Sequence, residues 1–197
     1  MPLRLQLAFL FCLLVLFAGV AAAAEPKVAV NVTQSGEAFL IDAVVDVPVP
    51  AARAWDVLID FDHMTSILGN LTSSRITSRN GNTWIVRQEG VARFGPLPIS
   101  FVSEREIRLE PMKRILAKNL SGTLKAMESE ATVIPQEQGV QIKYRATSVP
   151  DSVLARMFGA SFVRHETEEQ FSAMAREMVR RHASAGATGI PAESPAQ

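Results

Sequence analysis

Asp60, Asp62 and His63 stand close together in the segment DFDH and could do chemistry. Two carboxylates beside an imidazole can hold a metal ion or exchange protons with a substrate. The chain has only three histidines, however, and no second His-rich segment completes a set of ligands. Aspartates in a short turn commonly accept hydrogen bonds from nearby backbone N–H groups. We therefore expect these residues to cap a turn, and we expect no metal site and no cofactor.

A second group of residues would carry the reaction if the protein were an enzyme. It combines a phenol, an imidazole and an arginine near a carboxylate, and its members are Tyr144, His165, Arg87 and Glu89. His165 lies among charged residues, which indicates an exposed position on a helix. The sequence contains no nucleophile elbow, phosphate-binding loop, HExxH motif or dinucleotide-binding fingerprint. An enzyme is therefore the second hypothesis, after a protein that only binds.

Charged residues also gather on segments with strand-like patterns. Glu128 and Glu130 are two residues apart, so they share one strand face, where basic residues of neighbouring strands could pair with them. We expect this face, and the charged residues around Arg105, to point to solvent. The alternative is a buried arginine that holds the polar end of a ligand, and the candidates for that role are Arg145 and Arg87.

The first 24 residues have the pattern of a secretory signal peptide. Arg4 precedes an apolar run, residues 5–20, and small residues follow it. We expect cleavage after Ala24 and a periplasmic or secreted protein; the alternative is an uncleaved segment that anchors the protein in the inner membrane. The single cysteine, Cys12, lies in the apolar run, so the mature chain would have no disulfide and no thiolate chemistry.

The charge of the chain is balanced, with 20 basic and 20 acidic residues in 197. A balanced chain is not drawn to nucleic acid or to an anionic membrane surface. We therefore expect no nucleic-acid partner, and any membrane contact would be transient, for the exchange of cargo. The length fits one domain, and the sequence leaves the oligomeric state open.

The elements that must position these side chains begin after a lead-in segment, residues 25–36, for which an edge strand is the alternative because Val28, Val30 and Val32 alternate. Residues 39–47 alternate between apolar and polar, as in a half-buried strand. Pro50 is expected at the first position of a short helix, because apolar residues recur at helical spacing from Ala51 to Ile59. One further helical turn is expected at residues 64–68.

From residue 71 the pattern is that of an antiparallel meander. Strands are expected at residues 71–78, 83–92, 99–109, 114–120, 123–134 and 140–149. Asn80-Gly81 indicates a hairpin turn of type I′ between the first two. Residues 151–181 have the spacing of a long amphipathic helix with a bend at Gly159, and residues 183–197 have the composition of a disordered tail.

The order of these elements, together with the segment VDVPVPAARAWDVLIDFDHM at residues 45–64, resembles the START-like superfamily, also called SRPBCC. Within it the resemblance is to the branch of polyketide cyclases, dehydrases and lipid transport proteins and to coenzyme-Q-binding proteins, and it covers residues 37–182. It implies an α+β helix-grip fold, in which a curved antiparallel sheet of about six or seven strands wraps around the C-terminal helix. It also implies a cavity between them for a hydrophobic molecule.

Large apolar side chains would line such a cavity, although the same residues at helical spacing also fit a filled core. Ligand contacts are expected from Trp84, Phe101, Met127, Ile142, Tyr144, Arg145, Met157, Phe158, Phe162, Phe171 and Met174. Phe61, Met64 and Leu68 are expected to form the rim.

Three functions follow from these expectations. The first is an exported, non-enzymatic protein that holds a lipid, a quinone or a polycyclic compound. The second is an enzyme of the polyketide cyclase or dehydratase type, which folds its substrate and uses one or two acid/base residues. The third is an interaction domain with a filled core and no ligand.

Overall fold

The segments with alternating apolar residues form eight strands of one antiparallel sheet in the computed structural model, which describes residues 25–94, 97–150 and 159–187. The strands are β1 (Lys27–Ser35), β2 (Ala38–Val47), β3 (Leu71–Asn80), β4 (Thr83–Phe94), β5 (Leu97–Glu110), β6 (Arg114–Gly122), β7 (Leu124–Gln136) and β8 (Gly139–Pro150). Their order across the sheet is β1-β2-β8-β7-β6-β5-β4-β3. The predicted meander is therefore confirmed for β3 to β8, and β2 joins it by pairing with β8.

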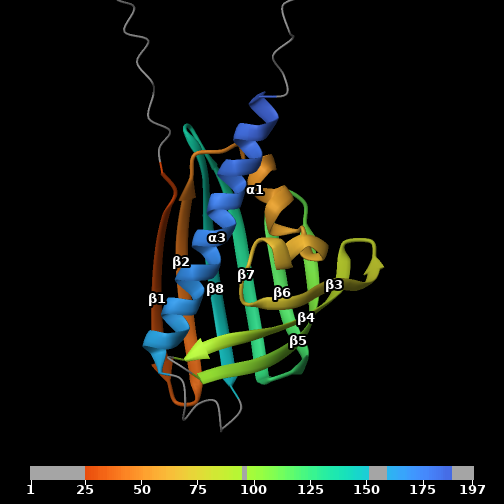
Figure 1. Ribbon diagram of the computed structural model, residues 1–197, viewed down its shortest axis with the longest axis vertical. Helices are drawn as coiled ribbons and strands as arrows, with labels where there is room; N and C mark the ends of the chain where they lie inside the picture. The colour runs from red at the N-terminus through yellow and green to blue at the C-terminus, as the bar shows by residue number, and fades with distance from the viewer. Residues whose placement is uncertain (1–24, 95–96, 151–158, 188–197) are drawn as a thin grey trace, which may run out of the picture.

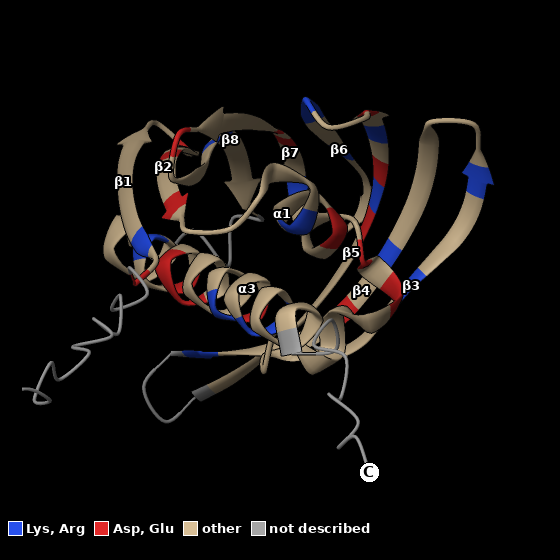
Figure 2. Cartoon of the chain, turned by 90° about the horizontal axis from the view of Figure 1, so that it is seen from above, with Lys and Arg blue, Asp and Glu red and all other residues tan. Residues whose placement is uncertain are grey.

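Three helices accompany the sheet among the described residues: α1 (Ala51–Leu58), the short 3-10 helix η1 (Phe61–Ser66) and α3 (Ala160–Ala187). α3 runs diagonally across the strands β1, β2 and β8 (Figure 1). Seen from above, the sheet curves around α3 and α1 (Figure 2). This arrangement confirms the predicted α+β helix-grip fold.

The sheet is larger than expected because the lead-in segment belongs to it. β1 pairs with β2 along its whole length, from Lys27 opposite Asp46 to Ser35 opposite Ala38. The valines of β1 alternate as in a strand, and they are half-buried where α3 packs over them. The sheet therefore has eight strands rather than six or seven.

The prediction for one turn and the prediction for the start of one helix are wrong in detail. β3 ends at Asn80 and β4 begins at Thr83, so the hairpin turn is Gly81-Asn82, and of these two residues only Gly81 has a positive φ, 54°. A type I′ turn requires a positive φ at both central residues. Pro50 precedes the first residue of α1 and serves as its N-cap, with φ −57° and ψ 145°.

α3 also ends later than the sequence indicates. It continues to Ala187, through residues that were expected to belong to the tail, because alanine favours a helix and the Ser184 hydroxyl donates to the Arg180 carbonyl at 3.0 Å. Gly159 precedes its first residue, and the helical segment expected before Gly159 lies outside the described residues. No helix in the described part of the chain is long and apolar enough to cross a membrane.

The concave face of the sheet is filled at one end. There α1 packs against β7, β8 and α3, and its Trp55, Val57 and Leu58 are buried. They meet inward side chains such as Ile142 and Val133 in the largest hydrophobic cluster. The long sheet extends beyond the reach of this eight-residue helix, and the space beyond α1 is where the site lies.

Candidate functional site

A cavity of about 380 Å³ lies between the sheet, η1 and α3. Its wall comes from the inner face of β2 and of β4 to β8, from η1 and from the first half of α3. This volume lies in the lower part of the range of roughly 300–1,000 Å³ that small-molecule sites occupy. The wall is mostly apolar, as such sites usually are.

Many of the side chains that the sequence predicted for the cavity are in its wall. Six of the expected ligand contacts line it, namely Phe101, Met127, Tyr144, Phe162, Phe171 and Met174. The three expected rim residues line it as well, and Phe61, Met64 and Leu68 are each less than 10% exposed. Contact of these residues with a ligand stays a prediction.

Three other residues expected at the cavity are absent from its wall. Ile142 is fully buried in the end that α1 fills. Trp84 stands near the start of β4, where its Nε1 donates to the Gly81 carbonyl at 3.1 Å and its ring packs edge-on against Phe61. Arg145 points outward from β8, is 85% exposed and pairs with Asp42. Met157 and Phe158 lie outside the described residues.

One residue supports the close packing of the wall by its lack of a side chain. Gly90 on β4 lies opposite Phe101 on β5. A Cβ at Gly90 would approach Phe101 Cζ to 2.6 Å. Only glycine at this position lets the Phe101 ring lie flat against the sheet and face the cavity.

Of the four residues proposed for catalysis, the cavity wall contains one. Tyr144 lines it, and its hydroxyl is hydrogen-bonded to Ser129. Burial raises the pKa of Tyr144, so this phenol stays protonated over the physiological range. Arg87 and Glu89 pair with each other on the outer face of β4, away from the cavity. His165 is exposed on α3, as its charged neighbours indicated, and it is absent from the cavity wall as well.

The arginine at the cavity is Arg105, which the sequence argument placed on the solvent face. Phe101, Ser103, Arg105, Ile107 and Leu109 alternate along β5, and Ile107 and Leu109 are buried. Residues two apart in a strand share a face, so Arg105 lies on the inner one and lines the cavity. The signal was present in the sequence, but the charges of Glu104, Glu106 and Arg108 obscured it.

A chain of hydrogen bonds leads from Arg105 to the rim. Arg105 Nη2 donates to Gln88 Oε1, Gln88 Nε2 donates to Ser74 Oγ at 3.0 Å, and Ser74 Oγ donates to the Phe61 carbonyl. Gln88 is only 7% exposed. Burial lowers the pKa of the Arg105 guanidinium, but an arginine remains charged at neutral pH.

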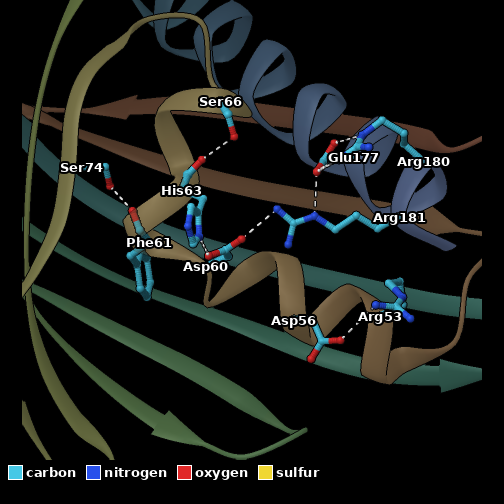
Figure 3. Close-up of polar contacts among 10 residues, drawn as sticks. All are labelled: Arg53, Asp56, Asp60, Phe61, His63, Ser66, Ser74, Glu177, Arg180 and Arg181. Atoms are coloured by element: carbon cyan, nitrogen blue, oxygen red, sulfur yellow. Dashed lines mark hydrogen bonds and ion pairs between the residues drawn. The ribbon is translucent and has the colours of Figure 1, made fainter. Parts of the chain in front are cut away.

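Asp60 connects the turn after α1 to the C-terminal half of α3 and does not cap it. Its carboxylate makes no cap hydrogen bond; Oδ2 lies 2.8 Å from Arg181 Nη2, and Oδ1 lies 2.6 Å from His63 Nδ1 (Figure 3). Glu177, also on α3, forms an ion pair with Arg181, with Glu177 Oε1 2.6 Å from Arg181 Nε. Burial raises the pKa of Asp60, but hydrogen bonds from His63 and Arg181 outweigh that effect and hold it below its ordinary value.

Asp62 attaches η1 to the sheet. Its Oδ1 accepts a hydrogen bond from the Ile76 backbone N–H at 2.8 Å, and its Oδ2 lies 3.2 Å from Arg79 Nη2. The acidic turn thus fixes η1 between β3 and α3, and η1 carries two of the rim residues. Among the described residues no group of three His, Cys, Asp or Glu side chains could hold a metal ion.

A second hollow, of about 680 Å³, lies on the outer face of the sheet, but it is open and lined by paired charges. Lys118 lies 3.7 Å from Glu128 and Arg145 lies 3.4 Å from Asp42. This is the solvent-facing charged surface that the sequence predicted for Glu128 and Glu130. Its charges already have partners, so the inner cavity is the candidate site.

The fold is shared with solved structures of several activities. The ZhuI aromatase/cyclase from Streptomyces sp. R1128 is 19% identical with a TM-score of 0.64, covering 76% of this chain and 98% of that one. The STAR-related lipid transfer protein fragment from Xanthomonas axonopodis is 11% identical with a TM-score of 0.58, and the match covers 82% of this chain and 95% of that one. Human STARD10 is 14% identical with a TM-score of 0.58, and the match covers 84% of this chain and 79% of that one. At such identities the likeness shows the fold alone.

No functionally curated protein matches the chain in sequence. The family model described as "Polyketide cyclase / dehydrase and lipid transport" matches residues 38–181, which comprise nearly the whole sheet and most of α3. The predicted resemblance to the START-like superfamily is thereby confirmed, and the chain belongs to the polyketide cyclase/dehydrase and lipid transport family.

Proposed function

We propose that the protein binds a hydrophobic small molecule, such as a lipid, a quinone or a polycyclic compound, in the cavity between the sheet and α3. The observation that carries this proposal is the mostly apolar cavity of about 380 Å³, which α1 leaves unfilled. A core without a ligand would be expected to close such a space, because a cavity lined by large side chains costs stability. Membership of a family described by lipid transport supports the same function.

We also propose that the protein is exported. The support is the N-terminal sequence, with Arg4, the apolar run at residues 5–20 and the alanines that end at Ala24. N-terminal sequencing of protein purified from cells should begin at Glu25. A sequence that begins at Met1 would contradict cleavage and would favour an anchored protein.

Binding can be tested with a neutral fluorescent probe, N-phenyl-1-naphthylamine, and by native mass spectrometry of gently extracted protein. We expect the probe to bind and a co-purified apolar molecule to be detected. Ala117→Phe fills the cavity, because Ala117 lines it, and should abolish probe binding. Ala29→Phe, at an exposed position of β1, is the matched control and should leave binding unchanged. Equal binding in both variants would overturn the proposal.

A second candidate is a cyclase or dehydratase, and the observation that favours it is Tyr144. Its protonated phenol lies in the cavity wall beside the charged Arg105, and such a pair can polarise and protonate a carbonyl oxygen. Tyr144→Phe should then abolish turnover of a poly-β-keto substrate while probe binding is kept. Unchanged turnover in that variant would exclude this role for Tyr144.

A further inference from the structure

We propose that the ligand is an acidic amphiphile, with one carboxylate that pairs with Arg105 and a single apolar chain or small ring system that fills the rest of the cavity. This inference rests on the proposed function, because it concerns the same cavity. It adds the charge of the ligand and the residue that recognises it.

The first observation is that Arg105 has fewer acceptors among the described residues than it has N–H donors. A guanidinium has five N–H donors, and the described residues offer Arg105 one acceptor, Gln88 Oε1. Its Nε is buried without a hydrogen-bond partner, and no carboxylate of the described residues forms an ion pair with it. A buried charge in a protein is normally paired, because an unpaired one costs several kcal/mol of desolvation. Within the described part of the chain, Arg105 therefore lacks an anion that would balance its charge.

The other arginines show that this is unusual in the molecule. Arg53 Nε is the other buried nitrogen without a hydrogen bond among the described residues, but Arg53 has Asp56 at 3.5 Å. Arg75, Arg93 and Arg176 form no ion pair with the described residues, and each is exposed to water. Arg105 alone combines partial burial in a cavity with the lack of a carboxylate within the described chain.

Gln88 cannot supply what is missing. Its amide has one carbonyl oxygen, which already accepts from Arg105, and its NH₂ group is committed to Ser74 at 3.0 Å. Ser74 in turn donates to the Phe61 carbonyl, so a rotation of the Gln88 amide would break the bonds on both sides. The chain of donors therefore holds the guanidinium in place and leaves its remaining N–H groups for a ligand.

One acid does line the cavity, but it is engaged elsewhere. Glu166 on α3 accepts a hydrogen bond from Asn70 Nδ2 at 3.2 Å and makes no ion pair with Arg105. The two charged groups belong to opposite walls, the helix and the sheet. The polar end of a ligand is therefore expected at the sheet, against Arg105, Gln88 and Tyr144.

A carboxylate suits Arg105 better than a neutral carbonyl does. A neutral acceptor would fill one hydrogen-bond position, whereas a carboxylate accepts two parallel N–H bonds and neutralises the buried charge. One guanidinium balances one negative charge, which favours a carboxylate over a phosphate monoester with close to two. The apolar wall and the modest volume then require one chain or a small ring system.

The test compares dodecanoate with methyl dodecanoate, at about pH 8 where the acid is ionised, as competitors of N-phenyl-1-naphthylamine. We expect dodecanoate to bind at least about tenfold more tightly, as a charge-assisted hydrogen bond predicts. In Arg105→Gln the affinities for the acid and the ester should lie within about threefold of each other, and the affinity for the ester should be unchanged. Arg105→Lys should show an intermediate preference for the acid, because lysine keeps the positive charge but cannot donate two parallel N–H bonds from a planar group.

Arg108→Gln is the matched control, since Arg108 lies on the same strand, faces outward and is 64% exposed. It should keep the full preference for the acid. Equal binding of acid and ester by the natural protein, or an equal loss of preference in Arg105→Gln and Arg108→Gln, would overturn the assignment of the head group while the cavity function stands. If the probe and both competitors fail to bind, the proposed function itself fails.

Discussion

Two arginines, one on α3 and one on β5, show opposite solutions to the burial of charge. Arg181 on α3 is about a quarter exposed and contacts two carboxylates, Asp60 at 2.8 Å and Glu177 at 2.6 Å. Arg105 on β5 lines the cavity, and its one hydrogen bond with the described residues goes to the neutral amide of Gln88. The Arg181 network is complete without any ligand, whereas the Arg105 site is incomplete.

This difference distinguishes a polar cluster that stabilises the fold from a site that can bind a ligand. Asp60, Asp62 and His63 have the residue types of an active site, but their partners are the groups that fix η1 between β3 and α3. Arg105 lies on a strand with several charged residues that face solvent, but the described partner of Arg105 is a neutral amide that does not balance its charge. A satisfied polar cluster is read as support for the fold, and an unsatisfied one is read as a place for a ligand.

Glu177→Gln should have the largest effect on stability, because it removes an acid from the completed network. A hydrogen bond from Arg180, opposed by burial and assisted by Arg181, lowers the pKa of Glu177 from 4.5 to about 2. The ionised form therefore stabilises the fold above about pH 4.5 by about 3 kcal/mol, and this contribution is lost as the pH falls toward 2. Urea unfolding of both proteins at several pH values should show a difference that shrinks below about pH 4.5. A difference independent of pH would contradict the account.

Arg181→Met should cost about 2 kcal/mol of unfolding free energy, since it removes the cation that Asp60 and Glu177 share in a partly buried place and leaves them only His63 and Arg180 as partners. This lies between the loss of a fully buried pair and that of an exposed one. Arg164→Met, which removes an exposed pair with Glu168 on the same helix, should cost less than about 0.5 kcal/mol. Equal costs in the two variants would show that the Arg181 network is an ordinary surface feature.

His63→Asn should have the smallest effect, under about 0.5 kcal/mol, because the His63 side chain is 74% exposed and stands at the edge of the network. Urea unfolding near pH 7 checks this value. A loss of unfolding free energy as large as that of Arg181→Met would contradict this account and show that His63 is a central member of the network.

The sequence predicted the parts of the molecule that depend on local pattern. Alternating apolar residues located the strands, and helical spacing located α1 and α3, because both periodicities follow from burial of one face. The cavity residues at such positions, among them Phe101, Phe171 and Met174, were found for the same reason. The rim residues followed from the resemblance to the family.

The remaining errors came from features that depend on pairing across the fold. The role of Asp60 depends on Arg181, more than a hundred residues later, and no local pattern reveals that contact. Arg145 and Ile142 were placed at the cavity without knowledge of the sheet order, which puts Arg145 outside and Ile142 beneath α1. Arg105 could have been found by applying the alternation of β5 strictly, with Ile107 and Leu109 as the guide.

The most direct test of the unbalanced charge is the unfolding free energy of Arg105→Met in protein freed of ligand by refolding from urea. Removal of an unpaired, partly buried cation should stabilise the empty protein by about 1 kcal/mol, opposite in sign to Arg181→Met, while Arg108→Met on the outer face should change it by less than about 0.5 kcal/mol. A loss of stability in Arg105→Met that matches or exceeds the loss in Arg181→Met would contradict the account, because Arg105 would then be a balanced structural residue and not a charge that waits for a ligand.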